Sequence, residues 1–181
     1  MKENKIVQFV CFETTLDSDE FLVQWEQYNK QISKDHEAFL QQKEEKKGGF
    51  RYVSQHHCSG SEFKFIFKKE KRSAHFPEVE IKVRQAGGYI LVQAECKHEP
   101  DEDESKILIF SNGTEADLHA YKQFPAYGKL NIYEAYYESC AYSYILEFFV
   151  ENIHASELLQ KLKTQTRVAE MGIYKECLVH A

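Results

Sequence analysis

The amino-acid sequence predicts an α+β protein in which antiparallel sheets are covered on one side by helices. Three observations support this class: strand and helix patterns alternate, they fall into two series, and an acidic stretch separates the series. With 181 residues, of which 43% are hydrophobic and 29% charged, the chain is large enough to bury a core. We therefore expect a first module over 1–98, a linker over 99–105 and a second module over 106–181.

The first series opens with a strand and a helix. Residues 6–12 are apolar on both faces, which predicts a central strand covered on each side. Asp17 is the expected N-cap of the following helix, with Glu20 completing a capping box. The apolar positions of this helix are Phe21, Trp25, Tyr28, Ile32 and Phe39. Gly48 and Gly49 can end it, and the spacing fits either one helix of about eight turns or two shorter pieces.

Two hairpins are expected next. Residues 50–58 and 62–69 form strands joined by the turn 59–61. Residues 79–83 and 90–96 alternate in the same way, and the glycines of the segment 86–88 predict a tight turn between them.

The second series is more regular. It predicts a strand, a helix, two aromatic strands in a hairpin, a helix and a final strand, over residues 107–110, 113–122, 130–140, 142–150, 152–164 and 172–180. This β-α-β-β-α-β order is the ferredoxin-like arrangement. Residues 12–25 also align with residues 149–162 at an offset of 137, which favours two tandem modules of related build.

The chain resembles the dimeric α/β barrel superfamily, which includes stress-responsive A/B-barrel and antibiotic-biosynthesis-monooxygenase-like domains. The segments that carry the resemblance are Lys5–Phe12, Ser18–Trp25 and Phe148–Leu162. The resemblance implies two ferredoxin-like sheets that enclose a barrel, within one chain or in a homodimer. The first module departs from the family by replacing its second helix with strands. The polar residues that support oxygen chemistry or haem breakdown in some relatives have no assigned counterpart here, so no catalytic residue is transferred and no cofactor is identified.

Composition excludes several classes of function. The net charge of −6 lies entirely in residues 101–181, which carry 7 basic and 13 acidic side chains, so a general nucleic-acid binder is not expected. No apolar run approaches the roughly 20 residues of a membrane helix, and no signal peptide is evident. Five widely spaced cysteines indicate reduced thiols and a cytoplasmic protein. The sequence motifs of P-loop, Rossmann, zincin and α/β-hydrolase enzymes are also missing.

The predicted aromatic hairpin carries the candidate ligand site. A sheet face that combines aromatic rings with a few carboxylates is a common way to build a small-molecule pocket. The candidate ligand-binding residues are Tyr133, Glu134, Tyr136, Glu138 and Glu147. A carboxylate buried there would have a raised pKa and could serve as a general acid or base. The same residues equally suit a half-buried sheet surface or a dimer interface.

A second candidate site is a metal site at residues 56–58. Strand alternation puts His56 and Cys58 on one face, and imidazole with thiolate suits zinc or copper. Further ligands would have to come from His75 or His98. The alternative is a strand end with one buried thiol.

The leading hypothesis is therefore a cytoplasmic protein that binds a small molecule or a protein partner through its sheet face. One alternative is a cofactor-free or haem-assisted monooxygenase or isomerase, which requires Glu134, Glu138 or Glu147 to point into an enclosed interior. The other is a metal-binding protein built on His56 and Cys58.

Overall fold

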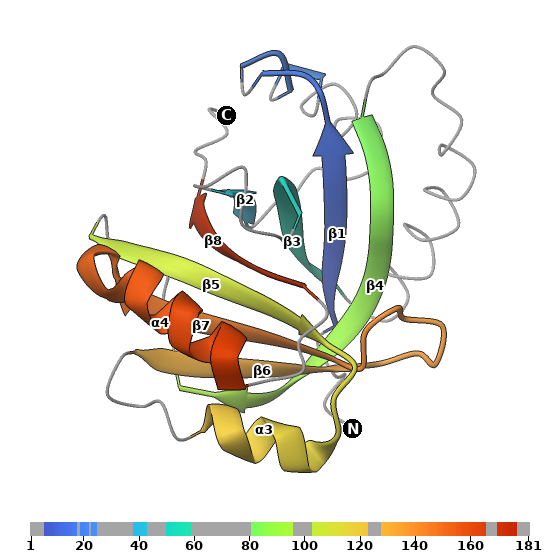
Figure 1. The fold of residues 1–181 in the computed structure, drawn as a ribbon. Coiled ribbons are helices and arrows are strands. Elements are labelled where there is room, and N and C mark those ends of the chain that lie inside the picture. Colours follow the sequence, from blue (N-terminus) through green and yellow to red (C-terminus); the bar gives the residue numbers. More distant parts are fainter. Residues whose placement is uncertain are drawn as a thin grey trace.

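The computed structural model describes residues 6–17, 19–21, 23–24, 38–42, 50–58, 81–95, 103–122, 128–165 and 170–176. It is an α+β fold (Figure 1). The elements are β1 (Ile6–Thr14), β2 (Ala38–Gln42), β3 (Tyr52–Cys58), β4 (Ile81–Ala94), β5 (Glu104–Ser111), α3 (Glu115–Tyr121), β6 (Lys129–Ala135), β7 (Tyr144–Glu151), α4 (Asn152–Gln165) and β8 (Glu170–Glu176).

The eight strands form a closed barrel with the order β1-β3-β2-β8-β5-β7-β6-β4. Every pair of neighbours is antiparallel. The first four strands make one arc, β4-β1-β3-β2, and the last four make the other, β8-β5-β7-β6. If the strands of each half are numbered one to four along the chain, both arcs have the order four, one, three, two. The two halves of the chain therefore build their parts of the barrel with the same strand order.

Two seams join the halves. At one seam β4 pairs with β6 over five residue pairs and contains an irregularity between Leu91 and Gln93. At the other seam β2 pairs with β8 over three residue pairs. By contrast β5 and β7, inside the second half, share eight pairs. Of the two seams between the halves, the β2–β8 seam is therefore the shorter.

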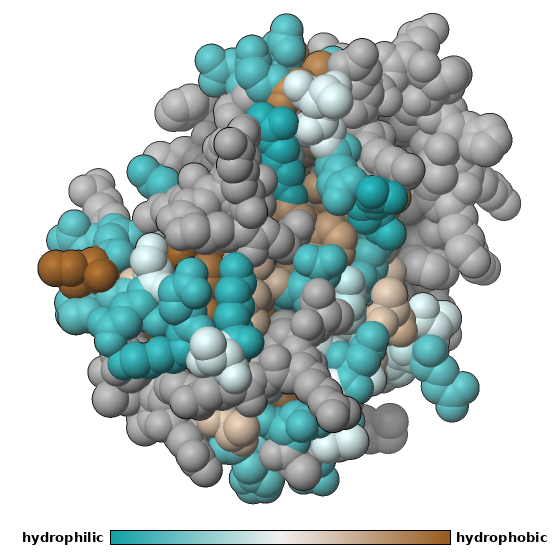
Figure 2. Space-filling model, viewed as in Figure 1, coloured by the Kyte–Doolittle hydropathy of each residue, from teal (hydrophilic) through white to brown (hydrophobic). Residues whose placement is uncertain are grey.

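One hydrophobic core lies between the second half of the barrel wall and its helices. In Figure 1 both α3 and α4 lie on the outside of β5–β8. The core residues on the helices include Leu118, Tyr121, Leu158, Leu159 and Leu162, which pack against Ile107, Ile109, Leu130, Ile132, Leu146, Phe148, Val150, Met171 and Ile173 of the strands. Figure 2 shows hydrophilic residues over most of the surface at α4, as expected for the opposite side of an amphipathic helix.

A second core fills much of the barrel interior. It consists of Val7, Phe9, Cys11, Phe50, Val53, Tyr89, Leu108, Phe110, Tyr133, Ile145 and Tyr174. The ring of Phe9 meets Tyr89 and Tyr133 edge-on, at centroid distances of 5.7 and 5.1 Å. The Tyr174 hydroxyl donates to the Phe50 carbonyl at 2.8 Å and accepts from the Phe50 amide at 2.9 Å. The sheet face without helices is thus the inner wall of the barrel.

Several predicted elements are confirmed. The β1 strand is buried on both faces over Ile6–Phe12. The Asp17 carboxylate accepts the Glu20 amide at 2.9 Å, as expected of an N-cap. The predicted strands at 50–58 and 107–110, both helices of the second half and the hairpin β6–β7 are present with bounds shifted by a few residues.

The second predicted hairpin is wrong, because β4 is one continuous strand. Gly87 and Gly88 pair with Phe9 and Gln8 of β1, within a run of pairs that continues without a shift from Ile6–Ile90 to Cys11–Gln85. A Cβ atom at Gly87 would lie 2.8 Å from Cε2 of Tyr89 and 3.2 Å from the Cys140 sulfur. Glycine here allows the close approach of side chains that cover the strand, which is another role of glycine in strands.

Of the two alternatives for the first helix, the single helix of about eight turns is wrong. Residues 19–21 and 23–24 are helical, but Phe39 lies in β2, which pairs with β3 and β8. The prediction failed because the seven-residue spacing from Ile32 to Phe39 fits two helical turns, although Phe39 belongs to a strand. The predicted turn 59–61 and strand 62–69 lie outside the described residues.

The offset of 137 does not relate equivalent positions in the two halves. It aligns β1 with β7, whereas the strand at the same place in the second arc is β5. Leu16 is 9% exposed and its counterpart Ile153 is 80% exposed, so the matched residues differ in environment. The last two residues of the predicted linker, Glu104 and Ser105, are the first residues of β5. Among the described residues, no helix is both long and apolar enough to span a bilayer.

Candidate functional site

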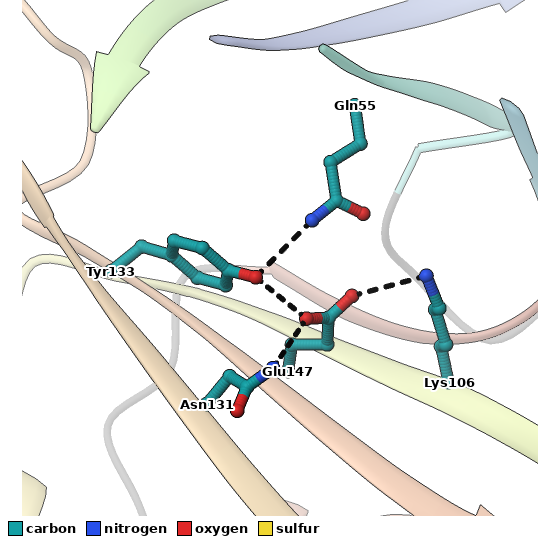
Figure 3. Close-up of polar contacts among 5 residues, drawn as sticks. All are labelled: Gln55, Lys106, Asn131, Tyr133 and Glu147. Carbon is teal, nitrogen blue, oxygen red and sulfur yellow. Dashed lines mark hydrogen bonds and ion pairs between the residues drawn. The ribbon is translucent and has the colours of Figure 1, made fainter. Parts of the chain in front are cut away.

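Five buried polar side chains meet inside the barrel, and we call them the interior polar cluster. They are Gln55, Lys106, Asn131, Tyr133 and Glu147 (Figure 3). They come from β3, β5, β6 and β7. Tyr133 belongs to the second core, which fills the barrel interior. Each of the other four lies two positions from a residue of that core on the same strand, so strand alternation directs its side chain inward.

Glu147 is the centre of this cluster and is 1% exposed. Its Oε2 accepts the Tyr133 hydroxyl at 2.8 Å and the Asn131 amide at 3.2 Å. The Lys106 ammonium lies 3.3 Å from Oε1. The same ammonium lies 5.4 Å from the centre of the Phe149 ring, a distance at which a cation–π interaction contributes.

Gln55 brings the first half of the chain into the cluster. Its Nε2 donates to the Tyr133 hydroxyl at 3.2 Å. The strand that carries it, β3, stands opposite β7 in the ring of eight strands. The chain of hydrogen bonds from Gln55 through Tyr133 to Glu147 therefore crosses the barrel interior, as Figure 3 shows.

The electrostatics of the cluster follow from burial. Removal from water, followed by the neighbouring Glu147 carboxylate and its hydrogen bond, raises the pKa of Tyr133 above its ordinary value of 10.0. Tyr133 is thus a neutral phenol that donates a hydrogen bond to the Glu147 carboxylate. The Lys106–Glu147 pair has side chains only 6% and 1% exposed. Such a pair loses much of its hydration, and its attraction and hydrogen bonds must offset that loss.

Two acceptor atoms in the cluster lack hydrogen-bond donors among the described residues. These atoms are Oε1 of Gln55 and Oε1 of Glu147, both removed from the molecular surface. The second has the Lys106 ammonium nearby, but without the geometry of a hydrogen bond. A buried acceptor without a donor costs free energy, which a bound hydrogen-bond donor would recover.

The structure brings together two of the five predicted ligand-binding residues. Tyr133 and Glu147 meet inside the barrel. Glu134 follows Tyr133 in β6, so its exposed side chain lies on the outer face. Tyr136 and Glu138 are exposed in the segment that joins β6 to β7. The expected common face for Glu134 and Glu147 is therefore wrong, because their strands direct them to opposite sides of the wall.

Sequence reasoning missed Lys106, Asn131 and Gln55. Strand alternation could have identified Lys106. The predicted strand began at residue 107, but β5 begins at Glu104, so Lys106 lies on the same face as Leu108 and Phe110. Asn131 had the same signal relative to Tyr133. Gln55 had a weaker one, because nothing in the sequence shows that β3 stands opposite β7.

The predicted metal ligands lie on β3. Cys58 is buried and packs with Ile6 and Tyr137, while the neighbouring His57 is exposed. His75 and His98 lie outside the described residues. Within the part of the chain that the structure describes, no group of three or more His, Cys, Asp or Glu side chains could hold a metal ion. The metal site stays a prediction.

The comparisons with known proteins do not assign the site. No protein-family model matches this chain, and no curated protein matches it either.

Proposed function

We propose that this chain is a small-molecule-binding protein made of two tandem ferredoxin-like modules, with its ligand held inside the barrel at the interior polar cluster. The shared strand order of the two arcs supports the modular description. An eight-stranded barrel has an interior that is filled by its side chains or holds one small ligand. The barrel interior thus takes the place of the open sheet face expected from the sequence.

One observation carries the proposal: five polar side chains, including an ion pair, converge in an interior whose core residues are mainly hydrocarbon and aromatic. Apolar residues of similar volume would fill the same space at little or no cost in stability. Convergent polar groups in an apolar setting are what a ligand site requires for orientation and specificity.

The test is ligand-dependent stabilisation in a thermal-shift screen of small molecules, because a ligand that binds only the folded state raises the unfolding midpoint. We expect hits with the unmodified chain and smaller shifts with Tyr133→Phe, which removes the hydroxyl that contacts Glu147 and Gln55. Tyr136→Phe is the matched control, since Tyr136 is 45% exposed and should leave the shifts unchanged. Hits that respond equally to both variants would place binding elsewhere.

A second candidate function is a cofactor-free or haem-assisted monooxygenase or isomerase that uses the cluster. The observation that favours it is the burial of Glu147 in direct contact with a phenol, 2.8 Å away. A carboxylate and a phenol in this position could pass a proton to and from a bound substrate. Turnover of a ligand found in the screen, lost in Glu147→Gln while binding persists, would support this function.

A further inference from the structure

We infer that the interior polar cluster takes a neutral alcohol or phenol with a compact apolar body, whose hydroxyl contacts Gln55, Glu147 and Lys106. This inference rests on the proposed function and names the class of ligand. It follows from three properties of the cluster: its unfilled hydrogen-bond positions, its charge balance and the residues that surround it.

The unfilled positions require a donor. Oε1 of Gln55 and Oε1 of Glu147 are both acceptors, and neither accepts a hydrogen bond from a described residue. The Lys106 ammonium lies 3.3 Å from Oε1 of Glu147 as an ion-pair partner, without hydrogen-bond geometry. In Figure 3 the Gln55 oxygen lies on the same side of the Tyr133–Glu147 hydrogen bond as the Lys106 ammonium. A hydroxyl placed there donates its proton to one of the two oxygens. Its own oxygen is then available to accept from Lys106, a group with three N–H donors.

The charge balance favours a neutral ligand. Lys106 and Glu147 already pair, so the cluster offers a cation or an anion little net attraction. Any ligand charge would lose its hydration on entering the barrel, and that loss would not be repaid. A carboxylate ligand also lacks the donor that the two oxygens need. An ammonium ligand has donors but would lie close to the Lys106 ammonium.

The surroundings favour an apolar body. Leu108 of β5 is the register partner of Glu147, and Phe149 of β7 is the partner of Lys106. The Phe9 ring approaches Tyr133 edge-on from the other half of the barrel. Apart from its hydroxyl, a ligand in contact with these groups gains by burying hydrocarbon surface.

The test uses four probes of nearly equal size: benzyl alcohol, toluene, benzylamine and benzoate. Their dissociation constants are measured by nuclear magnetic resonance titration of the full chain. We expect benzyl alcohol to bind about 10-fold more tightly than each of the others, the ratio that one additional buried hydrogen bond provides. Toluene binding as tightly as the alcohol, or tighter binding of the amine or the acid, would overturn the inference.

Gln55→Met tests the contact itself, since it removes the Oε1 acceptor, together with the Nε2 donor to Tyr133, and keeps the length of the side chain. We expect the alcohol to lose about 10-fold in affinity and toluene to be unaffected. Gln93→Met is the matched control, because Gln93 is half-buried in β4 and bonds Glu95 rather than the cluster. An alcohol that keeps its advantage in Gln55→Met would overturn the inference.

The outcomes distinguish a failure of the hydroxyl inference from a failure of the proposed function. Equal binding of all four probes inside the barrel leaves the proposed function in place and removes the inference about the hydroxyl. Absence of binding by all four removes the inference, and the wider screen then decides the proposed function separately. If Gln55→Met does not fold, the ranking of the four probes with the unmodified chain is sufficient to decide.

Discussion

At the residue scale, the main feature is a pair of opposite charges inside the barrel. Two ions leave water together there, and each depends on the other for compensation. The exposed pair Glu157–Lys161 on α4, at 2.7 Å, is shorter than the buried pair Lys106–Glu147 at 3.3 Å. Burial, and not distance, decides how much each pair matters to the fold.

Lys106→Met should therefore lower the free energy of unfolding by about 3–5 kcal/mol, because Glu147 stays buried without its cation. Lys161→Met should change it by about 0.5 kcal/mol or less, because water solvates Glu157. Urea unfolding of both variants measures the difference. Similar losses in the two variants would mean that Lys106 does not compensate Glu147.

The buried tyrosines predict how stability depends on alkaline pH. Burial raises the pKa of Tyr133, Tyr89 and Tyr174 above the ordinary value of 10.0. Above about pH 10 the unfolded chain releases these protons while the folded chain retains them, so the free energy of unfolding falls as the pH rises. Their stabilising contribution is fully present below that pH.

We expect Tyr133→Phe to reduce this decline by up to about 1.4 kcal/mol per pH unit, the contribution of one proton. Denaturant unfolding at a series of alkaline pH values, with tyrosinate absorbance as a second readout, measures it. A decline in Tyr133→Phe that equals the decline of the unmodified chain would contradict the assignment to Tyr133.

The sequence was sufficient to predict two cluster residues, Tyr133 and Glu147, because aromatic strands that contain carboxylates are recognisable by composition. It placed Glu134 on the wrong face because the register of β6 against β7 depends on the turn between them. That register pairs Asn131, and not Glu134, with Glu147.

At the element scale, the close packing of strand ends limits which residues the chain accepts. Gly128 precedes β6, and a Cβ atom there would lie 2.0 Å from the backbone oxygen of Phe149 in β7. Backbone cannot move aside in the way that a flexible side chain can. Any larger residue must separate the start of β6 from the end of β7.

Gly128→Ala should lower the free energy of unfolding by about 1–3 kcal/mol, the range found for overpacked sites. Gly87→Ala is the comparison, because its nearest obstacle is the Tyr89 ring instead of backbone. In Gly87→Ala, a further Tyr89→Leu replacement should recover part of the loss. Urea unfolding decides, and a neutral Gly128→Ala would contradict the close approach of the two strands.

Element boundaries were predictable where the periodicity was clear, as in α3 and α4, and where a cap was evident, as at Asp17. The predicted boundaries were wrong where the same residue type is common in two kinds of secondary structure. Glycines 87 and 88 fit a turn and equally fit a strand under a bulky cover, and only the ladder with β1 separates these two cases. Phe39 fits a helical stripe and a short strand in the same way.

At the scale of the whole molecule, the two seams should differ in how easily they open. The β2–β8 seam has three residue pairs and the β5–β7 pairing has eight. Amide hydrogen exchange should therefore be faster in β2 than in β5 and β7, because short edges open locally at lower free energy. Exchange measured by mass spectrometry or nuclear magnetic resonance tests this, and equal protection of β2 and β7 would contradict it.

The α+β class and the elements of the second half were predictable from sequence because they reflect local periodicity. A closed barrel was expected only from the resemblance to the dimeric α/β barrel superfamily. Pairings such as β4 with β6 join segments that are distant in the sequence, and local patterns do not encode them. Gln55 and Tyr133 are 78 residues apart, and no local pattern encodes their contact.

The last described strand has a consequence for synthesis on the ribosome. Because β8 lies between β2 and β5, both of these strands present unpaired edges until residues 170–176 have emerged. Nascent chains with such edges are open to pairing with one another. Until β8 has paired with both neighbours, the partly synthesised polypeptide is thus expected to benefit from chaperone protection.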